Sequence, residues 1–124
     1  MPAQVFYLDG GDGASTQALR AAGFATQQLH TANLFAGTCD ALRSPPHCLR
    51  NVYLGRAQDA LSTPPLSSTP FAAVYLDGCS GSSAPLVSMV RALFSDARRA
   101  VNPRSIAVGF TLTQACASGR GFFD

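Results

Sequence analysis

The chain of 124 residues contains neither lysine nor glutamate, so its nine basic residues are all arginine and its seven acidic residues are all aspartate. The absence of lysine excludes chemistry that needs this amine, including the phosphate-binding lysine of ATPase and GTPase loops. Charged residues make up only 13% of the chain and hydrophobic residues 47%, which is too apolar for a disordered tail. The net charge of +2 is too small to indicate nucleic-acid binding by itself.

Long hydrophobic runs are missing as well. No stretch approaches the roughly 20 apolar residues of a membrane-spanning helix, and residues 1–4 lack the basic and apolar segments of a secretion signal. We therefore expect a cytoplasmic protein with no membrane partner and with reduced cysteines. The length predicts a single domain over residues 1–124.

The cysteines form no Cys-x-x-Cys pair. Cys39, His47 and Cys48 come nearest to a zinc site, but their spacing fits none of the usual ligand patterns. Two prolines precede His47, which is typical of a loop. Inert thiols are the simpler interpretation.

Apolar, β-prone runs alternate with helical patterns along the whole chain. We predict strands at residues 5–8, 25–29, 52–54, 71–76 and 105–110. Helices are predicted between them, with Ser15 and Thr31 as caps of the first two. This alternation predicts an α/β fold, a three-layer sandwich around a mainly parallel sheet of about five strands.

The last predicted helix runs from Pro85 to a break at Asn102-Pro103 and carries Phe94 on its buried side. Four arginines lie in this helix and the turn after it, namely Arg91, Arg98, Arg99 and Arg104. We expect them to lie in water and to offset the helix dipole. Contact with a nucleic-acid phosphate backbone is the alternative.

Two of the predicted strands end in the same residues, Tyr-Leu-Asp-Gly, at positions 7–10 and 75–78. Ligands of parallel sheets bind beyond the carboxyl ends of the strands, where the strand order reverses. Both turns are expected at that edge of the sheet. They are therefore the first places to look for a site.

The turn at residues 9–13 does not fit a phosphate-binding loop. The dinucleotide fingerprint Gly-x-Gly-x-x-Gly fails because Thr16 stands at its last position. Asp9 and Asp12 would also repel a pyrophosphate, since like charges 4 Å apart cost about 4 kcal/mol at an effective dielectric constant of ~20. A cationic ligand with free hydroxyls and no phosphate fits this turn better.

The pattern Asp9-x-Gly11-x-Gly13-x-x-Thr16 resembles the first motif of the class I S-adenosylmethionine-dependent methyltransferases. The resemblance implies a Rossmann-like fold and S-adenosylmethionine as cofactor. It also implies that these four residues bind the cofactor.

The resemblance continues in order along the chain. His30 or Asn33 falls where the family usually has a ribose-binding acidic residue after strand two, and Asp59 resembles the residue that often meets the adenine amino group. Asp77 ends strand four, where the substrate-facing motif of the family begins. The departures are Ser15 in place of the third glycine and no carboxylate at the ribose position.

The family sheet also adds two strands after the fifth, whereas this sequence stops at Asp124. We therefore expect a truncated version of the fold, either a fragment or a shortened relative. Its fifth strand would form an exposed sheet edge through which the chain could pair with a partner.

Methyl transfer requires that acceptor and methyl group are held in line and that a proton is removed where needed. Asp77 is the candidate for orienting the acceptor or taking its proton; alternatively it only fixes the turn at Gly78. Cys79 lies in a stretch similar to the Asp-x-Pro-Cys-Ser-Gly motif of RNA cytosine-5 methyltransferases, whose second cysteine would correspond to Cys116. Neither thiol has a neighbouring lysine or histidine in sequence to lower its pKa.

These observations predict S-adenosylmethionine-dependent methyl transfer to an unidentified acceptor. An inactive domain of the same shape that binds another chain is the first alternative, and a nucleotide-binding domain is the second. Asp9 and Asp12 would, in a chain that binds nothing, stabilise only a tight turn and the start of a helix.

Overall fold

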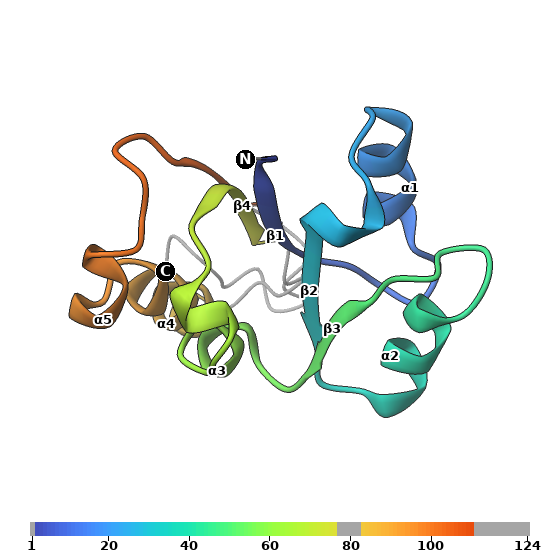
Figure 1. The fold of residues 1–124 in the computed structure, drawn as a ribbon. Helices are drawn as coiled ribbons and strands as arrows, with labels where there is room; N and C mark the ends of the chain where they lie inside the picture. Colours follow the sequence, from blue (N-terminus) through green and yellow to red (C-terminus); the bar gives the residue numbers. More distant parts are fainter. Residues whose placement is uncertain (1, 77–82, 111–124) are drawn as a thin grey trace.

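The structure is a computed structural model that describes residues 2–76 and 83–110. Five parallel strands form one sheet in the order β3-β2-β1-β4-β5 (Figure 1). The strands are Gln4–Leu8 (β1), Leu29–Asn33 (β2), Asn51–Leu54 (β3), Phe71–Leu76 (β4) and Ala107–Phe110 (β5). The predicted α/β class with a parallel sheet is therefore confirmed.

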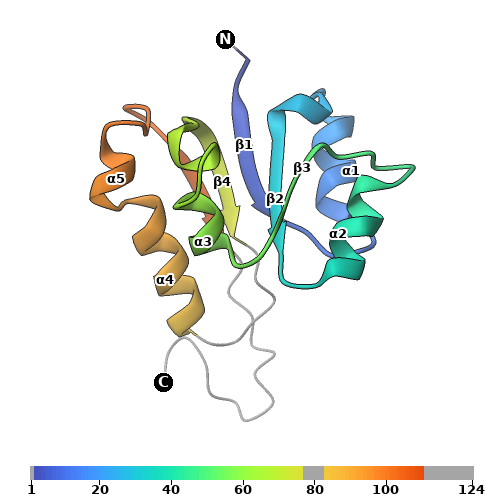
Figure 2. The same ribbon diagram turned by 60° about the horizontal axis from the view of Figure 1, so that its bottom comes forward.

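Helices cover both faces of the sheet and complete a three-layer sandwich. One face carries α1 and α2, and the other carries α3, α4 and α5 (Figure 2). Their bounds are Ala14–Ala21 (α1), Ala36–Arg43 (α2), Ala57–Leu61 (α3), Ser83–Leu93 (α4) and Asp96–Arg99 (α5). Short 3-10 turns lie at Thr26–Gln28 (η1) and Leu66–Ser68 (η2). Within the described residues no helix is long and apolar enough to cross a membrane.

Each face of the sheet has its own hydrophobic core. Val5 and Tyr7 of β1 pack toward α2 with Leu29 and Leu42, whereas Phe6 packs on the opposite face. The cluster on that opposite face includes Phe71, Val74, Leu76, Met89 and Leu93. A strand buried on both faces needs apolar residues at every position, which explains why β1 shows no polar alternation.

The second strand lies later in the chain than predicted. Residues 26–28 form η1, and β2 begins at Leu29. Thr31 was expected to cap a helix but is fully buried inside β2, and α2 begins only at Ala36. Burial between two helical layers thus outweighs the turn-forming tendency of the polar residues in this stretch.

The prediction of one long last helix is also wrong. Helix α4 ends at Leu93, and Ser95 begins the separate short helix α5. Phe94 is 51% exposed rather than buried. Arg98 is the opposite case, because it is fully buried and neither lies in water nor can reach a nucleic-acid backbone.

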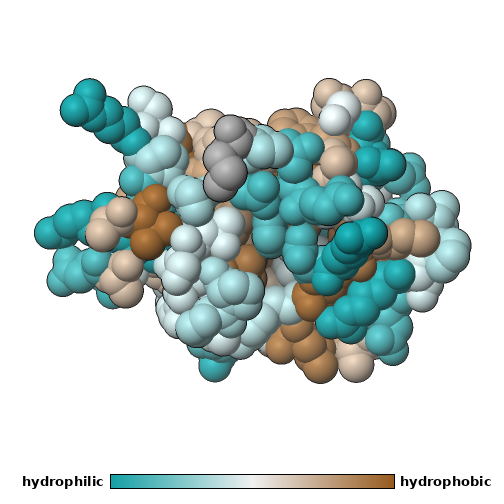
Figure 3. Space-filling view, in the orientation of Figure 1, coloured by the Kyte–Doolittle hydropathy of each residue, from teal (hydrophilic) through white to brown (hydrophobic). Residues whose placement is uncertain are grey.

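The strand order reverses between β1 and β4. From β1 the chain proceeds to β2 and β3 on one side, and β4 and β5 lie on the other side. The carboxyl ends of β1 and β4 therefore mark the point where ligands of such sheets bind, and the turn at Asp9 lies there. Asp77, Cys79 and Cys116 lie outside the described residues. The face seen in Figure 3 is mostly hydrophilic, with hydrophobic residues in small patches.

Candidate functional site

Asp9 follows β1 and is 8% exposed. Its Oδ1 accepts hydrogen bonds from the backbone N–H of Gly10 (2.9 Å) and Ser15 (3.3 Å). Its Oδ2 accepts bonds from the N–H (2.8 Å) and the hydroxyl (2.6 Å) of Thr16. Asp9 therefore caps the first turn of α1, while Ser15, the predicted cap, lies inside the helix.

Tyr7 extends this arrangement into the core. The Tyr7 hydroxyl donates to Thr16 Oγ1 at 2.8 Å, since the Thr16 hydroxyl itself donates to Asp9. Burial raises the pKa of Tyr7 to about 12. The sequence analysis placed Tyr7 in an apolar strand, and no local sequence pattern indicates its hydrogen bond to a threonine in the following helix.

Several backbone amides of this turn and of the start of α1 are already engaged. A phosphate would need them as donors, yet the amides of five residues bond to acceptors within the turn itself: Gly10, Gly13, Ala14, Ser15 and Thr16. The acceptors are the carboxylates of Asp9 and Asp12 and the carbonyl of Gly10. This geometry disfavours a polyphosphate ligand more strongly than charge repulsion alone.

The glycines of the turn differ in what the fold requires of them. Gly13 has φ +68°, and a Cβ there would lie 2.1 Å from the His47 ring, so the fold itself requires glycine. A Cβ at Gly11 would lie 3.9 Å from Thr38, which is ordinary contact, and Gly11 has no left-handed φ. Gly10 is similarly unconstrained. The fold therefore does not explain glycine at positions 10 and 11.

Asn33 ends β2 beside the turn. Its Nδ2 donates to the carbonyl of Asp9 at 3.1 Å, and its Oδ1 accepts from the N–H of Phe35 at 2.9 Å. The ends of β1 and β2 are thus tied together. Asn33, one of the two residues predicted for the ribose position, therefore lies at the candidate site.

His30 does not lie with Asn33. Its predicted place after the second strand depended on a strand at residues 25–29, whereas His30 is the second residue of β2. It lies at the opposite edge of the sheet, where its Nε2 is 2.7 Å from Gln4 Oε1. The structure therefore does not bring His30 together with Asn33 and the Asp9 turn.

Asp59 lies beyond the end of β3, in the first turn of α3. Its Oδ2 is 3.3 Å from Nε of Arg56, and both side chains are more than half exposed. Leu54 pairs with Asn33 in the sheet register, so α3 starts beyond the same edge. Three large apolar side chains are exposed at this edge, Leu34 (60%), Phe35 (70%) and Leu54 (53%).

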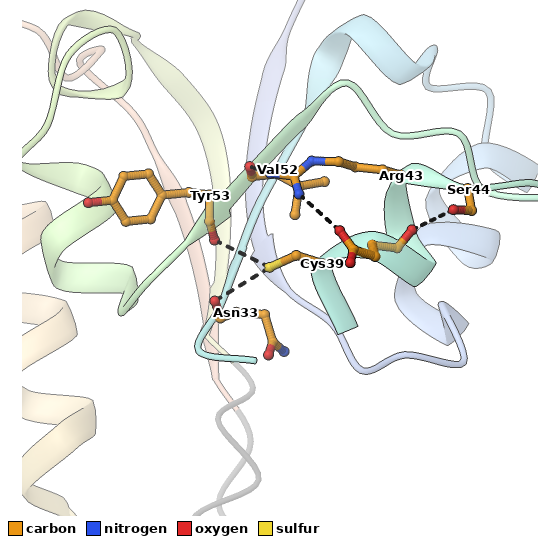
Figure 4. A network of polar contacts seen from close by, with 7 residues as sticks. Asn33, Cys39, Arg43, Ser44, Val52 and Tyr53 are labelled. Atoms are coloured by element: carbon orange, nitrogen blue, oxygen red, sulfur yellow. Dashed lines mark hydrogen bonds and ion pairs between the residues drawn. The ribbon is translucent and has the colours of Figure 1, made fainter. Parts of the chain in front are cut away.

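Cys39 lies in α2 beneath the ends of β2 and β3 (Figure 4). Its thiol approaches the carbonyl oxygens of Asn33 (3.6 Å) and Tyr53 (3.9 Å). Burial raises the pKa of this thiol, which lowers its reactivity. Cys48 is exposed, and the described residues contain no group of three side chains that could hold a metal ion.

Comparison with family models, with curated proteins and with solved structures finds no match to this chain. We therefore infer the function from the geometry of the sheet edge at which the carboxyl ends of β1 and β2 lie.

Proposed function

We propose that the carboxyl edge of β1 and β2 binds S-adenosylmethionine and that the domain transfers its methyl group to an acceptor. The observation that carries this proposal is the glycine turn at the reversal of strand order. The amides of Gly10 and of the first residues of α1 are engaged internally, and the fold does not require the small size of Gly10 and Gly11. Such a turn suits a ligand that approaches the backbone closely but carries no phosphate.

The edge beside the turn supports a nucleoside. Leu34, Phe35 and Leu54 offer exposed apolar surface on which a purine could lie. Asp59, beyond β3, is then the acceptor for the exocyclic amine, as the methyltransferase resemblance implies. Asn33 replaces the ribose-binding carboxylate, although its amide already bonds to Asp9 and Phe35.

Asp9 acts in this proposal through its charge rather than through a direct bond. Three backbone N–H groups and one hydroxyl occupy its carboxylate. Among the described residues, the exposed carboxylate of Asp12 accepts one hydrogen bond, from the N–H of Ala14 at 3.3 Å. Both carboxylates favour a ligand that carries a sulfonium and an ammonium group.

The transfer itself is a displacement. A lone pair of the acceptor forms a bond to the methyl carbon while the carbon–sulfur bond breaks, and its electrons go to sulfur to give S-adenosylhomocysteine. Asp77 remains our candidate for taking the acceptor proton. The covalent route through Cys79 and Cys116 remains the alternative for a cytosine acceptor.

A second candidate function is a domain of the same shape that binds no cofactor and pairs with another chain. The hydrogen bonds of Asp9 favour this candidate, because capping α1 is by itself a sufficient role for the Asp9 carboxylate. Pairing through the edge strand β5 is the route that the sequence predicts.

Calorimetry with S-adenosylhomocysteine separates the two candidates. We expect binding to the wild-type chain and at least about tenfold weaker binding to Gly11→Val, whose Cβ would lie in ordinary contact with Thr38, 3.9 Å away. Gly37→Val is the matched control, because nothing lies within 4 Å of a Cβ at this α2 position. It should bind like wild type.

Lack of binding to the wild-type chain at millimolar ligand would favour the cofactor-free domain. Equal or tighter binding of ATP would favour a nucleotide-binding domain. Asp9→Ala is a poorer test, because it removes the cap of α1 together with the charge.

A further inference from the structure

His30 is a buried titratable group that the proposed function does not use. It is 9% exposed, and its Nε2–H donates to Gln4 Oε1 at 2.7 Å. Its ring meets the Phe71 ring edge-on, with centroids 5.4 Å apart. Nδ1 is enclosed and has no hydrogen-bond partner among the described residues. This geometry holds the neutral imidazole with its proton on Nε2.

The surroundings of His30 oppose a positive charge. The residues that face His30 are Gln4 of β1, Asn51 of β3 and Phe71 of β4, which carry no charge. The charged group against Phe71 is Arg98, whose guanidinium carbon lies 5.2 Å from the ring centroid. A second proton on His30 would therefore face a cation across the ring rather than a carboxylate. Burial accordingly lowers the pKa of His30.

The chain beside His30 has room to move. A cleft of about 510 Å³ is lined by residues 2–4, His30, residues 68–70, Ala72 and Pro103. The pairing of β1 with β4 shifts register between Gln4 and Val5, so the ladder is irregular at the start of β1. Besides the bond to His30, residues 2–4 are held by a hydrogen bond from Gln28 Nε2 to the carbonyl of Ala3 at 2.9 Å and by the pairing of Gln4 with Phe71, so a release of this segment breaks these contacts as well.

We propose that His30 is a pH-dependent switch at the amino-terminal edge of the sheet. The neutral ring holds residues 2–4 through Gln4, and protonation of Nδ1 releases them and opens the cleft. A proton on Nδ1 creates a buried N–H without an acceptor and a buried charge without a counterion. Movement of His30 into the cleft relieves both and breaks the bond to Gln4. The proposal is independent of methyl transfer.

Amide hydrogen exchange between pH 7.5 and 5.5, corrected for intrinsic rates, tests this switch in the full chain. We expect the opening of amides at the start of β1 to increase by up to about tenfold per pH unit as one proton binds. Amides at Tyr7 and Leu8 should not change. His30→Phe should remove the pH dependence, and His47→Gln, the matched control at the other histidine, should retain it.

The same pH dependence in His30→Phe, or an increase spread over the whole sheet, would overturn the switch. If His30→Phe does not fold, the Cε1–H resonance of His30 in the wild-type chain decides. A midpoint below 6.5, the ordinary value, with a parallel shift of the Gln4 side-chain amide, supports the proposal. A midpoint at or above 6.5 contradicts it.

Discussion

The two edges of the sheet bury ionisable groups in different ways. At the carboxyl edge, donors from the chain surround the carboxylate of Asp9. At the amino-terminal edge, Arg98 donates to the carbonyls of Leu66 and Thr69, both at 2.7 Å, and to Asn102 Oδ1 at 3.2 Å. His30, at the same edge, leaves one nitrogen without a partner in the described part of the chain.

This difference shows under which condition a charged group can be buried. A charged group is tolerated inside the protein when each of its polar atoms has a partner, as for Asp9 and Arg98. A group that lacks a partner resists a charge, as for His30, whose pKa is lowered by burial. The carboxyl edge, where we propose that the ligand binds, therefore has a buried charge whose bonds are complete, whereas the amino-terminal edge contains a group whose protonation the fold resists.

Arg98→Met should give the largest effect. The substitution keeps much of the apolar stem but removes the donor to the Thr69 carbonyl and one of the two donors to the buried Leu66 carbonyl, which keeps the N–H of Thr69. We expect a loss of about 3 kcal/mol in the free energy of unfolding, measured by urea denaturation. Arg99→Met is the matched control, because Arg99 pairs with Asp96 on the exposed side of the same helix. Similar losses in both variants would contradict a special role for Arg98.

Asp9→Ala should follow, with a loss of about 2 kcal/mol, since the first turn of α1 loses its acceptor. Asp12→Ala removes a carboxylate from the same turn but only one exposed hydrogen bond, and should change stability little. Thermal unfolding of both variants measures the difference. A larger effect at Asp12 would mean that the fold does not depend on the bonds of Asp9.

The sequence predicts the sheet and the position of the Asp9 turn because strong apolar periodicity and a glycine-rich turn are local signals. It does not predict β2, because His30, Thr31 and Asn33 are polar residues buried only by contacts with distant segments. The burial of Arg98 is equally invisible, since its partners lie about thirty residues earlier in the chain. The sequence left two roles open for Asp9, binding of a ligand and capping of α1, and only the geometry shows the cap.

Tyr7→Phe tests the inner end of the Asp9 arrangement. The variant removes one buried hydrogen bond to Thr16 but leaves the bond from Thr16 to Asp9, so we expect a loss of about 1 kcal/mol. Because the folded-state pKa of Tyr7 is raised to about 12, its contribution is complete below pH 10 and is lost as the pH rises toward 12. The ultraviolet titration should lose its step near pH 12 in the variant. A step that persists there belongs to another tyrosine.

Thr31→Val should give the smallest effect and the opposite sign. Thr31 is fully buried in β2, and its Oγ1 has no hydrogen-bond partner among the described residues. Replacing this hydroxyl by a methyl group removes an unpaired polar atom and keeps the branched shape that suits a strand. We expect a gain of about 0.5–1 kcal/mol in the free energy of unfolding. A loss would mean that the hydroxyl is bonded in solution, and the rule drawn from Asp9, Arg98 and His30 would not extend to this strand.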